Sequence, residues 1–305
     1  MRDPYDTQVT LRAAFFDVGD TLVEHWAPRE LLRSRMREQV CAELGEQAWL
    51  DDLMDAHLEP GWSVPLAKAL AARDERGDRF APQDARQETL EWIRAWFQRR
   101  GLELDGLDLD RLRVLMCVPL RDVSTPVRGA LDTVRWCSDR GLRVVLVTNT
   151  LSRGDAEVLD DWRCFGLEDA VYGVVSSHSA RWRKPHPAIF ERALEIADAR
   201  PEEAFHVGDN LIADVWGAQQ IGMRGIWRRS DYADALAREG DVPSSPWREP
   251  RRRGPESCEH PSEDLFLRDG TVMCGGCGAP AGIRVRPDAI VRDLTEIPSL
   301  VERGL

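Results

Sequence analysis

The sequence predicts an α/β protein built on a Rossmann-like parallel sheet with helices on both faces. Three observations predict it: short apolar runs recur along the chain, helical patterns alternate with the later runs, and polar residues directly follow several runs. Strands that alternate with helices favour a parallel sheet whose two faces are both covered. Such sheets place their ligands at the carboxyl ends of the strands. An inserted helical cap domain and a small C-terminal zinc-ribbon-like insert complete the predicted architecture.

The strands of the core are predicted from four apolar runs, at residues 13–16, 144–147, 171–175 and 204–207. After the third run, residues 187–197 place apolar side chains at helical spacing, which predicts a helix there. The Rossmann-like core is therefore assigned to residues 1–23 and 121–230.

A helical cap is predicted at residues 24–120, because about a hundred residues separate the turn at Asp17 from the helix that leads into residue 144. Apolar residues recur three and four positions apart in two stretches of this segment, at Leu31, Leu32, Met36, Val40 and Leu44 and at Leu90, Ile93 and Phe97. This spacing is typical of amphipathic helices that pack on one another. We therefore expect a domain with its own core between the first strand and the rest of the sheet.

The C-terminal part of the chain divides into two further segments. Residues 241–257 are rich in Pro, Ser, Arg and Glu, which predicts a linker, and a cluster of cysteines follows them. Residues 231–286 are therefore assigned to a linker and a zinc-binding insert. Residues 287–305 return to an apolar pattern, which predicts a last strand and helix against the core.

Composition limits the partners of the protein. The formal net charge is −12, which argues against nucleic acid, because a nucleic-acid interface needs a basic face that displaces counterions. No run approaches the roughly 18 apolar residues of a membrane span. The first ten residues are polar and include Asp3 and Asp6, unlike a secretion signal. We therefore expect a cytoplasmic protein without a membrane partner.

Four motifs stand where strands are predicted to end: Asp17-Val18-Gly19-Asp20-Thr21, Thr148-Asn149, Lys184-Pro185, and Gly208-Asp209 with Asp214. A parallel sheet would bring the four loops to one edge. Together they offer a carboxylate nucleophile, acidic groups for Mg²⁺, a hydroxyl and an amide for phosphoryl oxygens, and a lysine that offsets charge. The combination predicts phosphoryl transfer.

In order and spacing, these motifs resemble those of the haloacid dehalogenase superfamily, in the branch with a helical cap inserted after the first strand. The stretches "KPHPAIF" and "VGDNLIADVWGAQQIGM" are close to the family's usual wording. The resemblance covers residues 13–228 and the terminal helix. It implies a hydrolase with a cap over its active site and a small phosphorylated or otherwise anionic substrate.

The resemblance also implies a role for each matching residue. Asp17 would be the nucleophile that forms a covalent aspartyl phosphate. Thr148, Asn149 and Lys184 would bind the transferring phosphoryl group. Mg²⁺ would be held by the Mg²⁺ set, which is Asp17, the backbone carbonyl of Gly19, Asp209 and, in support, Asp214.

Gly19 departs from the family pattern, because the phosphatases of the family usually carry there a second aspartate, which acts as general acid and base. A positioned acid–base group contributes typically 10²- to 10⁴-fold in rate. Its loss should matter least for substrates with acidic leaving groups. Asp20 or His25 could substitute, with His25 the less favoured of the two.

Three alternatives remain open from the sequence. A metal-independent 2-haloacid dehalogenase lacks the second aspartate, but carries a bulky aromatic at the position of Gly19. A phosphonate hydrolase uses a Schiff-base lysine from the cap, and Lys68, the one lysine of the cap segment, is interpreted as a surface residue. A catalytically weak or inactive relative would bind a phosphorylated ligand or a protein partner without turnover.

The C-terminal insert offers four residues of zinc-ligand type: Cys258, His260, Cys274 and Cys277. A Cys-x-x-Cys-Gly sequence is typical of a zinc knuckle, and four protein ligands predict a structural rather than a catalytic zinc. A redox pair or free thiols are the alternative interpretations. An insert of this kind could also bind a protein partner.

Overall fold

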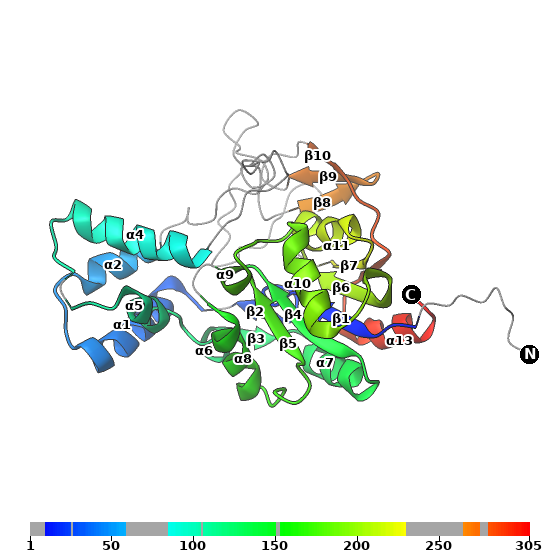
Figure 1. Ribbon diagram of the computed structural model, residues 1–305, viewed down its shortest axis with the longest axis horizontal. Helices are drawn as coiled ribbons and strands as arrows, with labels where there is room; N and C mark the ends of the chain where they lie inside the picture. Colours follow the sequence, from blue (N-terminus) through cyan, green and yellow to red (C-terminus); the bar gives the residue numbers. More distant parts are fainter. Residues whose placement is uncertain are drawn as a thin grey trace, which may run out of the picture.

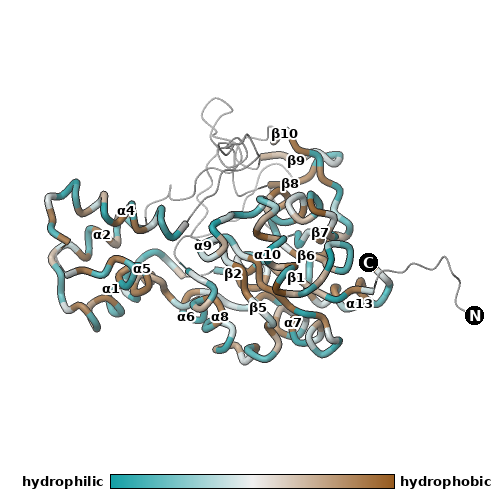
Figure 2. Tube along the Cα trace, in the orientation of Figure 1, coloured by the Kyte–Doolittle hydropathy of each residue, from teal (hydrophilic) through white to brown (hydrophobic). Residues whose placement is uncertain are grey.

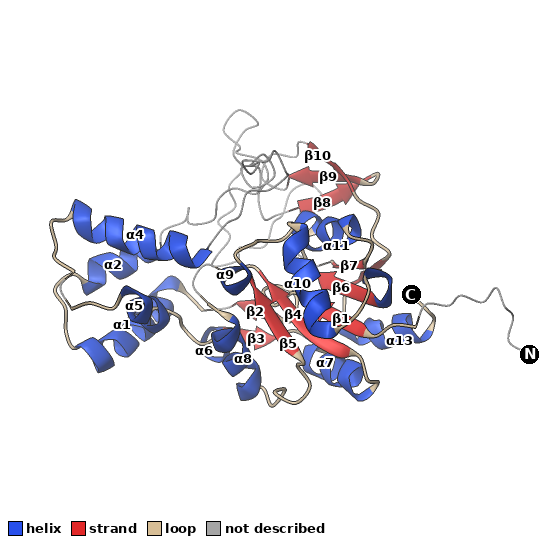
Figure 3. Cartoon of the chain, in the orientation of Figure 1, coloured by secondary structure: helices blue, strands red, loops and turns tan. Residues whose placement is uncertain are grey.

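The structure is a computed structural model that describes residues 10–25, 27–58, 85–104, 106–150, 153–229, 265–274 and 280–305. At its centre lies a six-stranded sheet in the order β11-β7-β6-β1-β4-β5, of which Figure 3 labels β7, β6, β1, β4 and β5. The strands are β1 (Ala13–Phe16), β4 (Arg143–Thr148), β5 (Gly173–Ser176), β6 (Ala204–Gly208), β7 (Arg224–Arg228) and β11 (Ala289–Val291). Every neighbouring pair is parallel, which confirms the predicted α/β class.

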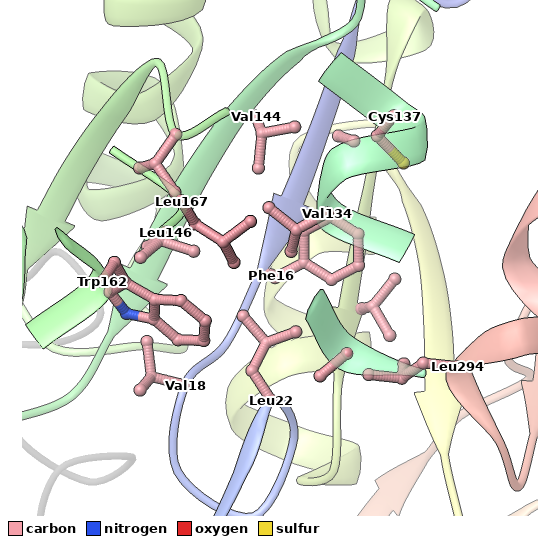
Figure 4. Packing of buried hydrophobic residues seen from close by; sticks show 14 of the residues in the cluster. Phe16, Val18, Leu22, Val134, Cys137, Val144, Leu146, Trp162, Leu167 and Leu294 are labelled. Carbon is pink, nitrogen blue, oxygen red and sulfur yellow. The ribbon is translucent and has the colours of Figure 1, made fainter. Parts of the chain in front are cut away.

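The central strand β1 is buried on both of its faces. Ala14 and Phe16 belong to one apolar cluster, and Ala13 and Phe15 to another, as the alternation of side chains along a strand requires. Figure 4 shows Phe16 packed among residues that come from distant parts of the chain. In Figure 2 the central strands are coloured as a hydrophobic part of the trace. Truncation of a phenylalanine buried in this way typically lowers the free energy of unfolding by about 3–5 kcal/mol. The packing of β1 therefore fixes the position of the residues that follow it.

Helices cover both faces of the sheet (Figure 1). The cluster around Phe16 includes residues of α7 (Ala130–Asp139), α8 (Asp155–Cys164) and α13 (Ile297–Glu302). The cluster around Phe15 includes residues of α10 (Pro187–Ala197) and α11 (Gly217–Gln220). The apolar spacing of residues 187–197 thus marks a helix with the bounds of α10. Among the described residues, no helix combines the length and the apolar character that crossing a membrane requires.

A group of helices lies beside the sheet and has an apolar cluster of its own. It is built from α1 (Arg29–Leu44), α2 (Leu50–His57), α4 (Ala85–Arg99), α5 (Leu109–Leu115) and α6 (Leu120–Val123). Trp96 and Phe97 are almost fully buried at its centre. The chain enters this group through β2 (Val23–His25) and leaves it through β3 (Ser124–Pro126), which pair as an antiparallel ribbon. Strands of three residues are too short for alternation to reveal, so the sequence did not predict this ribbon.

A second, antiparallel sheet follows in the C-terminal part of the chain. It consists of β8 (Leu265–Arg268), β9 (Thr271–Cys274) and β10 (Pro280–Arg284) in the order β10-β9-β8. Leu265 and Val272 pack with Trp227 of β7 and with residues of the π-helix Leu211–Trp216. The chain then adds β11 to the edge of the main sheet and ends near α13, after the 3-10 turn Leu294–Glu296.

The predicted zinc ligands are mostly beyond what the structure describes. Cys258, His260 and Cys277 lie outside the described residues, and Cys274 is buried at the end of β9. The zinc site therefore stays a prediction.

Candidate active site

Residues of three of the four motifs lie where neighbouring strands end at one edge of the sheet, whereas Lys184 lies beyond β5 and after the short helix α9 (Ser177–Ala180). Strand β1 lies between β4 and β6, and all three run in parallel. Asp17 directly follows β1, Thr148 is the last residue of β4, and Asp209 directly follows β6. The carboxyl ends of the three strands meet at the place where parallel sheets bind their ligands.

Lys184 is the centre of a buried charge cluster at this edge. Its Nζ lies 2.6 Å from Oδ1 of Asp17 and 2.5 Å from Oδ1 of Asp214. The side chains of Lys184 and Asp214 are 2% and 1% exposed, and that of Asp17 is 10% exposed. Since Asp17 keeps the largest exposure of the three, it is the member of the cluster that a ligand can reach.

The two carboxylates of the cluster differ in acidity. Burial raises the pKa of Asp17 to about 6, against the opposing pull of the Lys184 ammonium. Burial acts in the same direction on Asp214, but Lys184 and the hydrogen bond with His206 outweigh it and hold the pKa of Asp214 at about 2. Burial also disfavours the Lys184 ammonium, yet the two carboxylates overcome this and raise its pKa. Asp17 is thus ionised at neutral pH and remains the less stabilised anion, as a nucleophile should be.

A third carboxylate completes an acidic group. Three carboxylate oxygens, one from each of Asp17, Asp209 and Asp214, lie within 4.8 Å of one another. The Thr21 hydroxyl lies 3.2 Å from Oδ2 of Asp17 and 3.4 Å from Oδ1 of Asp209, so it links the first and the fourth of the four loops. Carboxylate oxygens grouped in this way fit a hard cation such as Mg²⁺.

The loop that carries Asp209 and Asp214 is held by hydrogen bonds between its own side chains and its backbone N–H groups. The Asn210 side chain accepts hydrogen bonds from the N–H groups of Ile212 and Ala213, and Asp214 Oδ2 accepts one from the Asn210 N–H at 3.0 Å. A Cβ on Gly208 would lie 2.1 Å from Cγ of Asp214. Only glycine therefore lets β6 approach the Asp214 carboxyl so closely.

Asn149 joins the loops that carry Thr148 and Lys184. Its side-chain amide accepts from the Lys184 backbone N–H at 2.8 Å and donates to the Lys184 carbonyl at 3.1 Å. This pair of hydrogen bonds holds the backbone from which the Lys184 side chain extends. Thr148 is 5% exposed and pairs with Ser176 of β5.

Gly19 lies in the tight turn that follows Asp17. Its φ is not in the left-handed region, whereas that of Asp20 is +53°. A Cβ built on Gly19 would have ordinary van der Waals distance, 3.6 Å, to Nε2 of His25. Neither backbone conformation nor space therefore requires glycine here. The turn is held from outside by Arg228, which donates to the Asp20 carbonyl at 2.6 Å.

Two neighbours of the site were missed by sequence reasoning. His206, fully buried in β6, lies with Nε2 2.8 Å from Oδ1 of Asp214. The Trp227 indole donates to the Asp209 carbonyl at 2.9 Å. The only signal for His206 was a lone polar residue inside the apolar run 204–207, and the contact of Trp227 depends on tertiary structure alone.

Comparison with known proteins identifies related sequences. A family model described as haloacid dehalogenase-like hydrolase matches residues 11–222. The human haloacid dehalogenase-like hydrolase domain-containing protein 3 is 40% identical over 95 residues, which are 31% of this chain and 36% of that protein. Glyceraldehyde 3-phosphate phosphatase of Pyrococcus furiosus is 43% identical over 112 residues, which are 35% of this chain and 44% of that enzyme. The chain thus spans less than half the length of these curated relatives.

A solved structure supports the same fold. L-2-haloacid dehalogenase of Xanthobacter autotrophicus superposes with a TM-score of 0.52 at 20% sequence identity, over 96% of this chain and 99% of that chain. Since the family model covers more than half of the sequence and three of the predicted motifs lie where adjacent parallel strands end, the protein belongs to the haloacid dehalogenase-like hydrolases.

Proposed function

We propose that the protein is a Mg²⁺-dependent phosphatase that hydrolyses a small phosphorylated metabolite through an aspartyl-phosphate intermediate on Asp17. The observation that carries the proposal is the buried cluster of Lys184 with Asp17 and Asp214, beside the third carboxylate of Asp209. A nucleophilic carboxylate, a lysine that bonds it and an acidic group of metal-ligand type are the parts that phosphoryl transfer requires. The phosphatase from Pyrococcus furiosus supports this reaction class.

In the proposed reaction, the free oxygen lone pair of Asp17 attacks phosphorus and the bond to the leaving oxygen breaks. Lys184 orients Asp17 and offsets the negative charge of the phosphoryl oxygens, and the Thr148 hydroxyl donates to one of them. Asn149 would bind the same group, and its side chain also keeps the Lys184 backbone in place. Water then attacks phosphorus and releases Asp17.

The Mg²⁺ set fits a divalent cation, because its three carboxylates each bring one oxygen within 4.8 Å of the others, and the Thr21 hydroxyl lies near two of them, Asp17 and Asp209. Asp17, Asp209 and the Gly19 carbonyl would hold Mg²⁺, with Asp214 in support. When bound, it supplies positive charge to the phosphoryl oxygens. Asp214 also retains Lys184 and His206 as partners, which keeps it ionised.

The helices between β2 and β3 would act as the cap that selects the substrate. Contacts between this group and the core support the role: Arg183, which precedes Lys184, lies 3.5 Å from Glu88 of α4. Substrate binding and the position of the lysine loop would therefore be linked. We also retain a structural zinc at Cys258, His260, Cys274 and Cys277 as an expectation, which metal analysis of the purified protein checks.

The test is release of phosphate from 4-nitrophenyl phosphate, an acyl phosphate and a sugar phosphate with Mg²⁺. The wild type should turn over and Asp17→Asn should lose at least 10³-fold, because the covalent path is removed. Arg192→Gln is the matched control, since its ion pair with Glu195 is exposed and remote from the cluster. Phosphate release that is equal in wild type and Asp17→Asn would contradict the proposal.

The same variants separate the two rival functions. Asp17-dependent chloride release from 2-chloropropionate, unaffected by a chelator, would favour a dehalogenase. Phosphate-ester binding by both wild type and Asp17→Asn without turnover would favour a binding module.

A further inference from the structure

The reaction proposed for Asp17 leaves two proton transfers without a donor and acceptor. The leaving oxygen must gain a proton when its bond to phosphorus breaks, and the attacking water must lose one. Gly19 has no side chain to offer. Lys184 is buried and bonds two carboxylates, and Asp214 is buried with Lys184 and His206 as partners. These groups maintain the charge cluster, so side chains outside the cluster are the candidates for the proton transfers.

His25 is placed beside the turn that carries the nucleophile. The chain reverses after Val18, whose carbonyl accepts from the Val23 N–H at 3.1 Å, and Gly19 forms a β-bridge with Val23. Strand β2 then extends for three residues and pairs His25 with Ser124 of β3. The ribbon therefore brings the side chain at position 25 back over the turn.

The imidazole of His25 lies next to the place where a side chain on residue 19 would begin. Among the described residues that are not its chain neighbours, Nε2 of His25 is the atom within 4 Å of a Cβ built on Gly19, at 3.6 Å. Residue 19 stands between Asp17 and Thr21, whose side chains meet at 3.2 Å. His25 itself is exposed, so its ring is not in the core.

We propose that His25 is the general acid and base of this reaction, acting from the flanking ribbon in the space next to Gly19. This inference rests on the proposed phosphatase function. In the first step, Asp17 bonds to phosphorus, the bond from phosphorus to the leaving oxygen breaks, and protonated His25 gives its Nε2 proton to that oxygen. In the second step, neutral His25 takes a proton from water, the water oxygen bonds to phosphorus, and the bond from phosphorus to Asp17 breaks. Phosphate leaves and His25 is protonated again.

The two steps make different demands on His25, which provides the test. An aryl phosphate such as 4-nitrophenyl phosphate has a leaving group that needs no proton, whereas glycerol phosphate does need one. The water-dependent step is common to both substrates. In His25→Gln we therefore expect a burst of about one equivalent of 4-nitrophenolate followed by turnover that is 10²- to 10⁴-fold slower than in the wild type. With glycerol phosphate the first turnover itself should be slow.

Three further variants exclude a merely structural role. His25→Ala should regain part of its turnover when imidazole is added. Gly19→Asp in the His25→Gln background should raise glycerol phosphate turnover at least tenfold, because position 19 accepts a side chain. Asp20→Asn, which changes the rival carboxyl, should show no burst. Urea midpoints within experimental error of the wild type establish that these chains fold.

The inference is overturned if His25→Gln turns over within threefold of the wild type. It is also overturned if His25→Gln slows the first and the later turnovers of the aryl phosphate equally and imidazole does not rescue His25→Ala. Either result in a protein whose activity depends on Asp17 leaves the phosphatase function standing and removes only His25. Absence of Asp17-dependent release in the wild type would overturn both.

Discussion

Replacing Lys184 by methionine removes the ammonium that bonds two buried carboxylates. Methionine keeps most of the apolar stem, so the change isolates the charge. Loss of one partner from a buried ion pair costs about 3–5 kcal/mol, because the remaining charge keeps its desolvation penalty. Since the unfolding entropy is about 2.1 cal/mol/K per residue, each kcal/mol lowers the melting midpoint of this chain by roughly 1.5 °C, so we expect a loss of roughly 5–8 °C.

The stability lost in Lys184→Met depends on pH through the pKa of Asp17. Asp17 has a raised pKa of about 6 with Lys184 present, and removal of the ammonium raises it further. The folded variant then binds a proton that the unfolded chain, with its pKa near 3.9, does not bind. Acidification from pH 7.5 to about 5.5 should therefore stabilise the variant relative to the wild type, by about 1–2 kcal/mol.

Urea unfolding followed by circular dichroism, in the presence of a chelator, measures both effects. Lys184→Met is compared with Asp17→Asn and with the double variant, and the exposed Arg192→Met serves as the control that should cost less than about 1 kcal/mol. We expect the double variant to recover about 1–3 kcal/mol relative to the sum of the single changes. Two results would refute a coupled buried cluster: free energies of unfolding that are additive in the double variant, or a difference in free energy between Lys184→Met and the wild type that is equal at both pH values.

Three other predictions concern the metal, the pH and the backbone. Mg²⁺ at 100 times its Kd should stabilise the wild type by about 2.7 kcal/mol but not Asp209→Asn, which thermal melts with and without EDTA would reveal; equal shifts would argue against this site. Burial lowers the pKa of His178 to about 4, so the unfolded chain binds the extra proton and stability falls as the pH drops from about 6.5 to 4. Over this pH range the free energy of unfolding of His178→Asn, measured with urea, should fall by about 1–2 kcal/mol less than that of the wild type, a figure reduced because the ring is partly solvated. An equal fall in both proteins would contradict the lowered pKa of His178. Gly208→Ala forces a Cβ against the Asp214 carboxyl, and we expect destabilisation of about 1–3 kcal/mol with loss of phosphatase activity; an unchanged urea midpoint would show that β6 can move away.

The fold was predictable where a strand is mostly apolar. The runs at β1, β4 and β6 consist of residues that are buried on both faces of the sheet, and hydrophobicity marks them even though His206 stands inside the third. Strand β7 was not predicted, because Arg224, Gly225 and Arg228 interrupt its apolar residues. Arg228 is buried by its contacts with the turn after Asp17, and a sequence pattern counts such an arginine as exposed.

The candidate site was predictable only as a set of loops. The positions of Asp17, Thr148 and Asp209 follow from the rule that parallel strands end at one edge, and the structure brings their loops together there. Their energetic partners do not follow from any local pattern. The contact of His206 with Asp214 needs the turn at Gly208, and the proximity of His25 to Gly19 needs a ribbon whose second strand is about a hundred residues further along the chain.

The position of β11 has a consequence for where this protein can be cut. The family model ends at residue 222, but β7 starts at Arg224 and β11 at Ala289, so two strands of the main sheet lie beyond that limit. A chain shortened to the matched segment would leave β6 as an open edge, with unpaired backbone groups that can recruit the edge of another molecule. It would also lose the Trp227 hydrogen bond to Asp209 and the contact of Thr133 with the Leu294 carbonyl. The folding unit therefore extends through α13, and the family match marks only part of it.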